Sequence, residues 1–455
     1  MATNLSSAGW MPPAQLSREQ VIAMNDAALA RPSLPVKVTE DIFRVEALGM
    51  EWDIGTDIYT PEGPITKGAD GKKVGVFLLH GGAGDAKSME RFSRLFAEKF
   101  GFKVVVMTYP GRTYLDDPSR NWPGDTINDD GSVRTPMWVK GEYVTRDQYD
   151  IVKDEGKKMK YGTRTSARAK PGTRFYYRMA AWPIAFEEGM KAACRRQFPE
   201  GEFSIYVHGH STGGPYVSML TQRVPNIAGV LAIENSTFGY INERKHIWGG
   251  HVGKIDGFER VAKTGDSWKD PFNDLYIRTW RDLARYRGPE ALGQEGPQAL
   301  MRLPWLMEEI FEAWDVAKLR PQFKAEYMVT HNIVGALEEA ARVSAKRLNY
   351  GPDQTEELVA HYIGFTRELK GPGVKPVPPY LFGLAKDSRD HNPEVYKEVI
   401  LPMFAAMSPA PKTAVTRFGA GVHTYTKPEK DLPFGIAPPA AQLYHDAILG
   451  GFYLV

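Results

Sequence analysis

The sequence has little cysteine: its 455 residues include one, Cys194. A single cysteine excludes an intramolecular disulfide framework and fits a reducing compartment. Cys194 lies in a helical pattern, where we expect a small buried side chain rather than a reactive thiol. Long hydrophobic runs are also absent, since no stretch approaches the roughly 18–20 apolar residues of a membrane span, and residues 1–10 lack the features of a signal peptide. These absences predict a soluble cytoplasmic protein without a membrane partner.

The chain also lacks a large excess of positive or negative charge. The 57 Lys and Arg residues nearly balance the 55 Asp and Glu residues, which gives a formal net charge of +2. This balance provides no basic field for nucleic acid, so we expect no nucleic-acid partner. No two histidines have the H-E-x-x-H spacing of a zinc hydrolase. The glycine-rich run at residues 81–84 lacks the third glycine of the dinucleotide motif G-x-G-x-x-G. We therefore expect neither a metal nor a cofactor.

What the chain does have is an alternation of apolar runs with helical patterns. Six runs predict strands of the sheet, and the first is nearly continuous, as expected of a strand buried on both faces. The six are Lys73–His80, Phe102–Tyr109, Phe203–Gly209, Ile227–Glu234, Pro379–Asp387 and Thr413–Phe418. Helical patterns separate or follow them at 88–100, 175–198, 216–223, 393–404 and 440–449. Earlier runs at 42–48 and 52–59 indicate a hairpin or a meander. Together they predict an α/β fold with a mainly parallel sheet of about eight strands and helices on both faces.

The same patterns divide the chain into parts. Residues 1–40 are polar and Pro-punctuated and form an N-terminal arm, in which Ser17 and Gln20 have the spacing of a helix capping box. In residues 113–173 the regular pattern stops, and we expect a solvated surface excursion. Helical patterns dominate residues 237–376, which predicts a mostly helical cap inserted between two sheet strands. The core then comprises residues 41–236 and 377–455. Either insertion is also a candidate interface between copies, so a homo-oligomer stays open.

One stretch carries the clearest chemical signal. The apolar run that begins at Phe203 ends in Gly209-His210-Ser211-Thr212-Gly213, and a helical pattern follows. Strand, tight turn with serine at its tip, and helix form the context in which G-x-S-x-G marks a nucleophile. The glycines lack Cβ, so the strand and helix can approach closely while Ser211 is held in a strained conformation. The helix N-terminus adds unpaired N–H groups beside the serine oxygen. We predict that Ser211 is a nucleophile.

A serine hydroxyl needs a base, and the base needs an acid that fixes its tautomer. Among the ten histidines we favour His423, because it follows the last predicted strand in a Gly-flanked loop. His208, within the strand before Ser211, is expected to pack or hydrogen-bond there. His210 is a candidate for lining the substrate pocket. His80 is expected to brace the glycine turn that follows it.

These features resemble the α/β-hydrolase superfamily, in its chain order of serine, acid and histidine. The motifs that carry the resemblance are His80-Gly81-Gly82, Gly209-His210-Ser211-Thr212-Gly213, an acid after a late strand and Gly421-Val422-His423. The resemblance covers residues 42–236 and 377–455. It implies an α/β-hydrolase fold with an oxyanion hole formed by the backbone N–H groups of Gly82 and Thr212, and Gly81 beside the substrate.

The acid has two open candidates. Asp387 follows the strand at 380–385, which is where the resemblance places the acid in most members. Glu234 ends the strand that follows the predicted nucleophile's helix, where a buried carboxylate without a partner would be costly. A minority of the superfamily has its acid at that strand. Asp390, in the same loop as Asp387, is a lesser substitute. We favour Asp387 and keep Glu234 as its competitor.

The sequence therefore predicts a serine hydrolase. Ser211, His423 and one carboxylate would cleave a carboxylic ester, or an amide, of a small apolar or aromatic compound through an acyl-enzyme. The same triad acting on a peptide, a thioester or a C–C bond is an alternative. A non-catalytic ligand-binding protein on the same fold is another, because fold does not imply function. The insertions predict an enclosed, selective site.

Overall fold

The structure is a computed structural model of the 455-residue chain. It describes residues 15–47, 50–81, 85–114, 137–159, 162–170, 173–211, 213–221, 224–234, 351–356, 377–387 and 410–455. The helix predicted at 393–404 and all of the predicted cap except 351–356 lie outside these residues. Among the helices that are described, none has the length and apolar character needed to cross a membrane.

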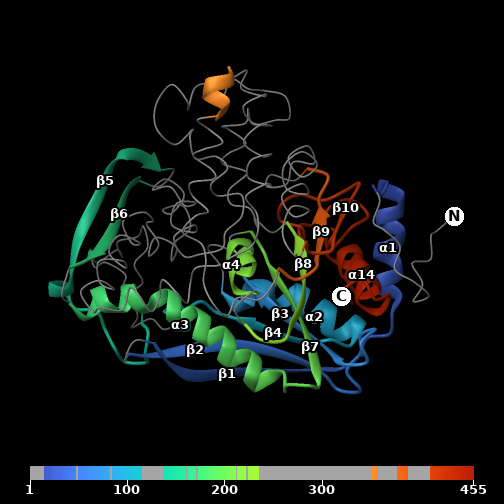
Figure 1. The fold of residues 1–455 in the computed structure, drawn as a ribbon, viewed down its shortest axis with the longest axis horizontal. Coiled ribbons are helices and arrows are strands. Elements are labelled where there is room, and N and C mark those ends of the chain that lie inside the picture. Colours follow the sequence, from blue (N-terminus) through green and yellow to red (C-terminus); the bar gives the residue numbers. More distant parts are fainter. Residues whose placement is uncertain are drawn as a thin grey trace.

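The described strands form an eight-stranded central sheet (Figure 1). Its strands are β1 (Val36–Ala47), β2 (Met50–Pro61), β3 (Lys73–Leu79), β4 (Lys103–Met107), β7 (Phe203–Gly209), β8 (Ile227–Ile233), β9 (Tyr380–Leu384) and β10 (Thr413–Arg417). Their order is β1-β2-β4-β3-β7-β8-β9-β10. The hairpin of β1 and β2 and the pair of β2 and β4 are antiparallel, and every other pair is parallel. The predicted sheet is confirmed.

Helices lie on both faces of this sheet (Figure 1). They are α1 (Arg18–Ala30), η1 (Ala86–Met89), α2 (Glu90–Phe100), α3 (Arg174–Gln197), α4 (Gly213–Leu220) and α14 (Ala437–Leu449). Val76 and Leu78 of β3 pack in one cluster with α1, α2 and α14. Successive side chains of a strand point to opposite faces, so Phe77 and Leu79 face the side that carries α3 and α4. Helices on both faces of a mainly parallel sheet confirm the predicted α/β-hydrolase fold.

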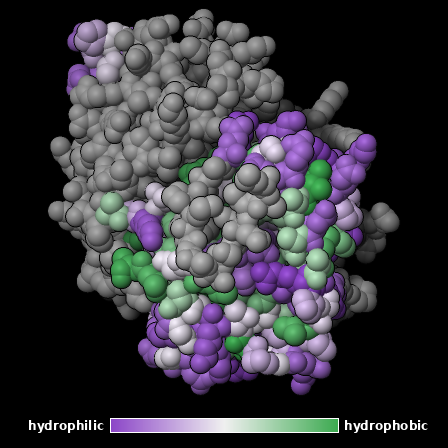
Figure 2. Space-filling view, turned by 90° about the vertical axis from the view of Figure 1, so that its right-hand side faces the viewer, coloured by the Kyte–Doolittle hydropathy of each residue, from purple (hydrophilic) through white to green (hydrophobic). Residues whose placement is uncertain are grey.

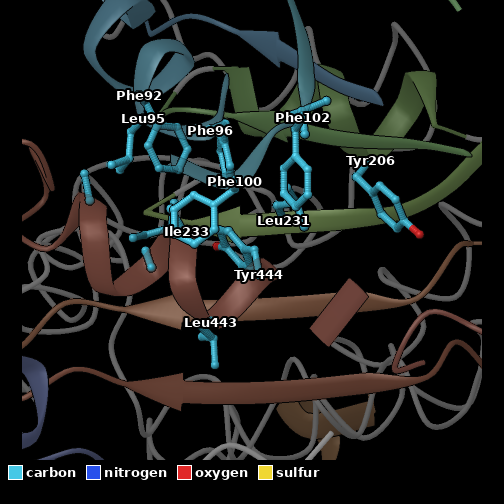
Figure 3. Packing of buried hydrophobic residues seen from close by; sticks show 14 of the residues in the cluster. Phe92, Leu95, Phe96, Phe100, Phe102, Tyr206, Leu231, Ile233, Leu443 and Tyr444 are labelled. Atoms are coloured by element: carbon cyan, nitrogen blue, oxygen red, sulfur yellow. The ribbon is translucent and has the colours of Figure 1, made fainter. Parts of the chain in front are cut away.

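The main core lies between the sheet and α2 (Figure 3). Phe92, Phe96 and Phe100 recur at helical spacing on α2 and are all buried. The ring of Phe96 lies 4.5 Å from that of Phe92 and 5.8 Å from that of Phe102, the residue directly before β4. Burial of each such ring contributes about 2–3 kcal/mol to folding. Leu231 of β8 belongs to the same cluster, so the core supports the strands next to the predicted nucleophile.

The N-terminal helix is capped as its sequence predicts. The Ser17 hydroxyl accepts a hydrogen bond from the N–H of Gln20 at 3.2 Å, and the Gln20 side chain accepts one from the N–H of Ser17 at 2.8 Å. The helix α1 packs against α14, which joins the two ends of the described chain (Figure 1). Strand β1 begins at Val36, inside the segment predicted as the arm.

The excursion at residues 113–173 contains regular structure that the sequence analysis missed. Strands β5 (Tyr149–Met159) and β6 (Gly162–Ala169) form a separate antiparallel sheet at one edge of the molecule, after the short η2 (Arg146–Gln148) (Figure 1). The prediction that the regular pattern stops throughout this region was therefore wrong. The reason is physical: among the described strands the hairpin pairs only with itself, and its sequence is polar, so no apolar alternation marks its strands.

On the face shown in Figure 2, hydrophobic residues of the described surface lie in small separate groups among hydrophilic ones. Single exposed apolar residues of this kind are normal for a globular protein. Burial raises the pKa of the Cys194 thiol, which is free and buried in α3. Because the thiolate is the reactive form, this environment supports the packing role that the sequence predicts.

Candidate active site

The turn between β7 and α4 has the geometry that its sequence predicts. Ser211 has a φ of +51°, a left-handed conformation that is strained for a residue with a side chain. A Cβ on Gly209 would lie 2.3 Å from the carbonyl oxygen of Gly213, and a Cβ on Gly213 would lie 2.8 Å from that of Leu79. Only glycine fits such contacts. The glycines therefore allow α4 to start directly against the sheet, with Ser211 at the tip of the turn.

Ser211 is tied through its main chain to the end of the neighbouring strand β8. Its N–H donates a hydrogen bond to the carbonyl oxygen of Glu234 at 3.0 Å. Glu234 itself has a φ of +46°, so the chain turns sharply where β8 ends. The Ser211 side chain is largely buried, with a residue exposure of 7%. Among the described residues no hydrogen bond joins its hydroxyl to His423; catalytic hydrogen bonds commonly tighten when substrate binds.

The Glu234 carboxylate is fully buried and has partners on both oxygens. Oε1 accepts a hydrogen bond from the N–H of Ala385 at 2.8 Å, and Oε2 lies 3.3 Å from Nδ1 of His423. A carboxylate accepts the proton of Nδ1–H, so in the neutral ring Nε2 is the nitrogen that carries no proton. Glu234 and His423 are 189 residues apart in sequence and meet because β8 and the loop after β10 end at the same edge of the sheet.

Asp387 reaches the same loop through its main chain only. Its N–H donates to the carbonyl oxygen of Gly421 at 3.0 Å, and it forms a bridge with Val422. Its side chain is exposed. Within the described part of the chain, its carboxylate makes no hydrogen bond and no ion pair. The structure thus brings Glu234, and not the favoured Asp387, to His423. Asp390 lies outside the described residues.

His210 contacts His423, the predicted base. Its ring lies 5.1 Å from that of His423 in a stacked arrangement, and its Nε2 is 3.3 Å from the carbonyl oxygen of His423. Gly81 is adjacent, since a Cβ there would lie 3.0 Å from Nδ1 of His210. Gly82 and Thr212 lie outside the described residues, so the predicted oxyanion hole stays a prediction.

His80 hydrogen-bonds to Gly81, the first residue of the glycine run. Its Nδ1 donates to the carbonyl oxygen of Gly81 at 2.7 Å, and its ring stacks on Tyr109 with centroids 3.8 Å apart. The Tyr109 hydroxyl donates to the carbonyl oxygen of His80 at 2.5 Å. Burial, and then the nearby Arg112 guanidinium, hold the pKa of His80 well below its ordinary value. His80 is therefore neutral at physiological pH and acts as a structural hydrogen-bond donor.

Tyr425 is a site residue that the sequence analysis did not single out. Its hydroxyl lies 3.2 Å from Nε2 of His208, whose Nδ1 lies 2.6 Å from the carbonyl oxygen of Leu231. Burial lowers the pKa of His208 to about 4. The sequence signal that could have identified Tyr425 was its position two residues after His423. A tyrosine buried there would need a hydrogen-bond partner for its hydroxyl.

Metal ligands are not grouped here. No cluster of three or more His, Cys, Asp or Glu side chains in the described parts of the chain could hold a metal ion.

Comparisons with known proteins give structural neighbours only. No family model and no curated protein sequence matches the chain. A thermostable esterase from Pseudomonas putida is 13% identical, with a TM-score of 0.36 over 97% of this chain and 91% of that one. An arylesterase is 12% identical, with a TM-score of 0.34 over 96% and 89%. A carboxyl esterase from Bacillus coagulans is 12% identical, with a TM-score of 0.31 over 83% and 90%. TM-scores below 0.5 establish no activity for this chain.

Proposed function

We propose that this protein is a serine hydrolase that cleaves a carboxylic ester, or an amide, of a small apolar or aromatic compound. The observation that carries the proposal is the buried pair of Glu234 and His423, 3.3 Å apart, beside Ser211 on a strained strand-to-helix turn. A buried carboxylate is costly unless it is paired and hydrogen-bonded. This one is paired with an imidazole at the edge of the sheet that also presents the serine.

The roles follow from the chemistry of these groups. Ser211 attacks the substrate carbonyl while Nε2 of His423 takes the hydroxyl proton. Glu234 holds the Nδ1–H tautomer and stabilises the imidazolium that forms. The N–H groups of Gly82 and Thr212 receive the oxyanion of the tetrahedral intermediate. His423 returns its proton to the leaving group, and it then activates the water that releases the acyl group from Ser211.

Asp387 takes no part in this scheme, because its carboxylate is exposed and Glu234 occupies the position at Nδ1. His210 and Gly81 lie where they border the substrate. The helical patterns of residues 237–376 support a cap that encloses the acyl group and sets the bond preference. The substrate is a small molecule. The free, buried Cys194 supports a reducing, cytoplasmic location.

Substrate profiling tests this proposal. Wild type, Ser211→Ala and Ser93→Ala are assayed on p-nitrophenyl esters, anilides and thioesters. Ser93 is a matched control, because it is a buried serine of α2 whose hydroxyl donates to the carbonyl oxygen of Met89 at 2.9 Å. We expect ester turnover by wild type and Ser93→Ala and none by folded Ser211→Ala. Turnover of thioesters without esters or anilides would favour the alternative bond types.

A further inference from the structure

The main chain of His423 is held by two donors on its own carbonyl oxygen. The N–H of Tyr425 donates to it at 3.0 Å, and Nε2 of His210 lies 3.3 Å from it. A carbonyl oxygen can only accept, so His210 must carry its proton on Nε2. One donor comes from the loop itself and the other from the turn that presents Ser211. The position of the base is thereby coupled to the position of the serine.

The Tyr425 side chain is in turn anchored to the sheet. The Leu231 carbonyl oxygen can only accept, so Nδ1 of His208 carries the proton of the 2.6 Å bond. The neutral ring then has Nε2 as an acceptor, and the Tyr425 hydroxyl donates to it at 3.2 Å. Both residues are buried, with exposures of 0% for His208 and 3% for Tyr425. The hydrogen-bonded chain therefore runs from β8 through β7 to the loop of His423.

Aromatic contacts enclose the Tyr425 ring. It meets the rings of Phe92 and His210 edge to face, at 5.1 and 5.2 Å between centroids. Phe92 also contacts His208, at 5.4 Å. Because these rings fill the space around the hydroxyl, the tyrosine has one orientation and the loop it belongs to is fixed with it.

We propose that Tyr425, anchored by His208 and assisted by His210, is a positioning residue that holds His423 in register with Glu234. This inference rests on the proposed function of His423 as the base. Leu231 lies in β8, and Glu234 directly follows this strand. One strand therefore positions both the proposed acid and the carbonyl oxygen at which the series of hydrogen bonds through His208 and Tyr425 begins. The 3.3 Å separation of Glu234 and His423 is at the long limit for a hydrogen bond, so a small shift of the loop breaks it.

The test compares two single-atom deletions. Tyr425→Phe removes the hydroxyl that binds His208. Tyr453→Phe is the matched control, because Tyr453 is also buried and its hydroxyl donates to the carbonyl oxygen of Val230, the residue next to Leu231, at 2.9 Å. Of these two tyrosines, Tyr425 is the one whose main-chain N–H donates to His423. We expect Tyr425→Phe to lower kcat for a p-nitrophenyl ester by about tenfold or more with little change in KM, since a misplaced base affects the chemical step. Tyr453→Phe should leave both constants nearly unchanged.

A spectroscopic readout decides the proposal even without ester turnover. Nitrogen-15 histidine spectra report the tautomer and the pH titration of each ring, with His423 assigned through His423→Gln. We expect the Nδ1–H tautomer of His423 in wild type and Tyr453→Phe, and a mixture of tautomers with an altered titration in Tyr425→Phe. The same tautomer and titration in all three proteins would overturn the proposal. If the spectra are as expected but the wild type turns over no ester, the hydrolase function is overturned and the positioning role remains supported.

Variants of His210 provide a second arm if Tyr425→Phe does not fold. The amide of His210→Gln can still donate to the carbonyl oxygen of His423, whereas His210→Ala cannot. We expect His210→Ala to lower kcat and shift the His423 tautomer, and His210→Gln to restore both in large part. Equal behaviour of the two variants would contradict the role of this hydrogen bond.

Discussion

Glu234 and Asp387 end neighbouring strands, yet they meet different surroundings. The chain turns at Glu234 with a φ of +46°, which places its carboxylate against His423 and the N–H of Ala385. Asp387 binds the histidine loop by its main chain and leaves its side chain exposed. The directions of these two side chains therefore support Glu234 as the proposed acid.

Replacing each carboxylate by its amide distinguishes the two acid candidates. Glu234→Gln keeps the shape of the side chain but cannot stabilise the imidazolium, and its amide favours the wrong tautomer. We expect kcat to fall by about 10³–10⁴-fold, as for other triads that lose their acid. Asp387→Asn, the matched control, should change kcat less than about threefold. Steady-state kinetics on p-nitrophenyl acetate measure both, and a larger loss in Asp387→Asn than in Glu234→Gln would contradict the assignment.

The buried His208 makes the stability of the fold depend on pH. Burial lowers its pKa to about 4, below the ordinary value of 6.5 that it regains on unfolding. As pH falls through 6.5 the unfolded chain gains a proton that the folded chain does not, so the stability due to neutral His208 is complete above 6.5 and is lost towards pH 4.

Urea unfolding at pH 7 and pH 5 measures this effect. The neutral His208 should account for a loss of about 2 kcal/mol of unfolding free energy between these two values. His208→Gln has no titrating ring. Its unfolding free energy should therefore fall by about 2 kcal/mol less than that of wild type between pH 7 and pH 5. An identical pH dependence in the two proteins would show that His208 is not buried as a neutral ring.

At the scale of elements, the turn between β7 and α4 depends on close backbone contact. A methyl group at Gly209 would lie 2.3 Å from the carbonyl oxygen of Gly213, and backbone cannot move aside as a side chain can. Gly209→Ala should therefore destabilise the fold by about 3 kcal/mol, at the upper end of overpacking costs. Gly63→Ala is the control, because a Cβ there meets nothing within 4 Å. Equal denaturation midpoints of the two variants would contradict this account of the turn.

The elements that the sequence predicts well are those with a strong period. The buried strands around Phe77 and Val105 are continuous apolar runs, and α2 places its phenylalanines every four residues. The serine turn was predictable because its glycines and its flanking strand and helix all indicate one geometry. The strands β5 and β6 were missed because their polar sequence carries no alternation.

The limits of sequence reasoning lie in the site itself. Strand ends can be placed from the sequence, so both acids could be assigned to one edge of the sheet. The φ of Glu234 and the exposure of Asp387 depend on tertiary contacts with Ala385 and Gly421, which no local pattern records. The hydrogen bond of the Tyr425 hydroxyl is likewise not recorded in any local pattern, because its partner His208 lies 217 residues away.

At the scale of the whole molecule, the site is assembled from two distant parts of the chain. Ser211 and Glu234 precede the predicted cap at 237–376, and His423 follows it. The parallel pairing of β8 with β9 and of β9 with β10 brings these parts together at one edge of the sheet. We propose that the predicted cap encloses the substrate beside Ser211, as an enclosed, selective site requires.

Intact-protein mass after treatment with a fluorophosphonate tests whether Ser211 is an activated nucleophile. We predict one covalent adduct on wild type, one on Ser93→Ala and none on Ser211→Ala. An adduct on folded Ser211→Ala would contradict this prediction. So would wild-type protein that forms no adduct and also fails to hydrolyse p-nitrophenyl acetate.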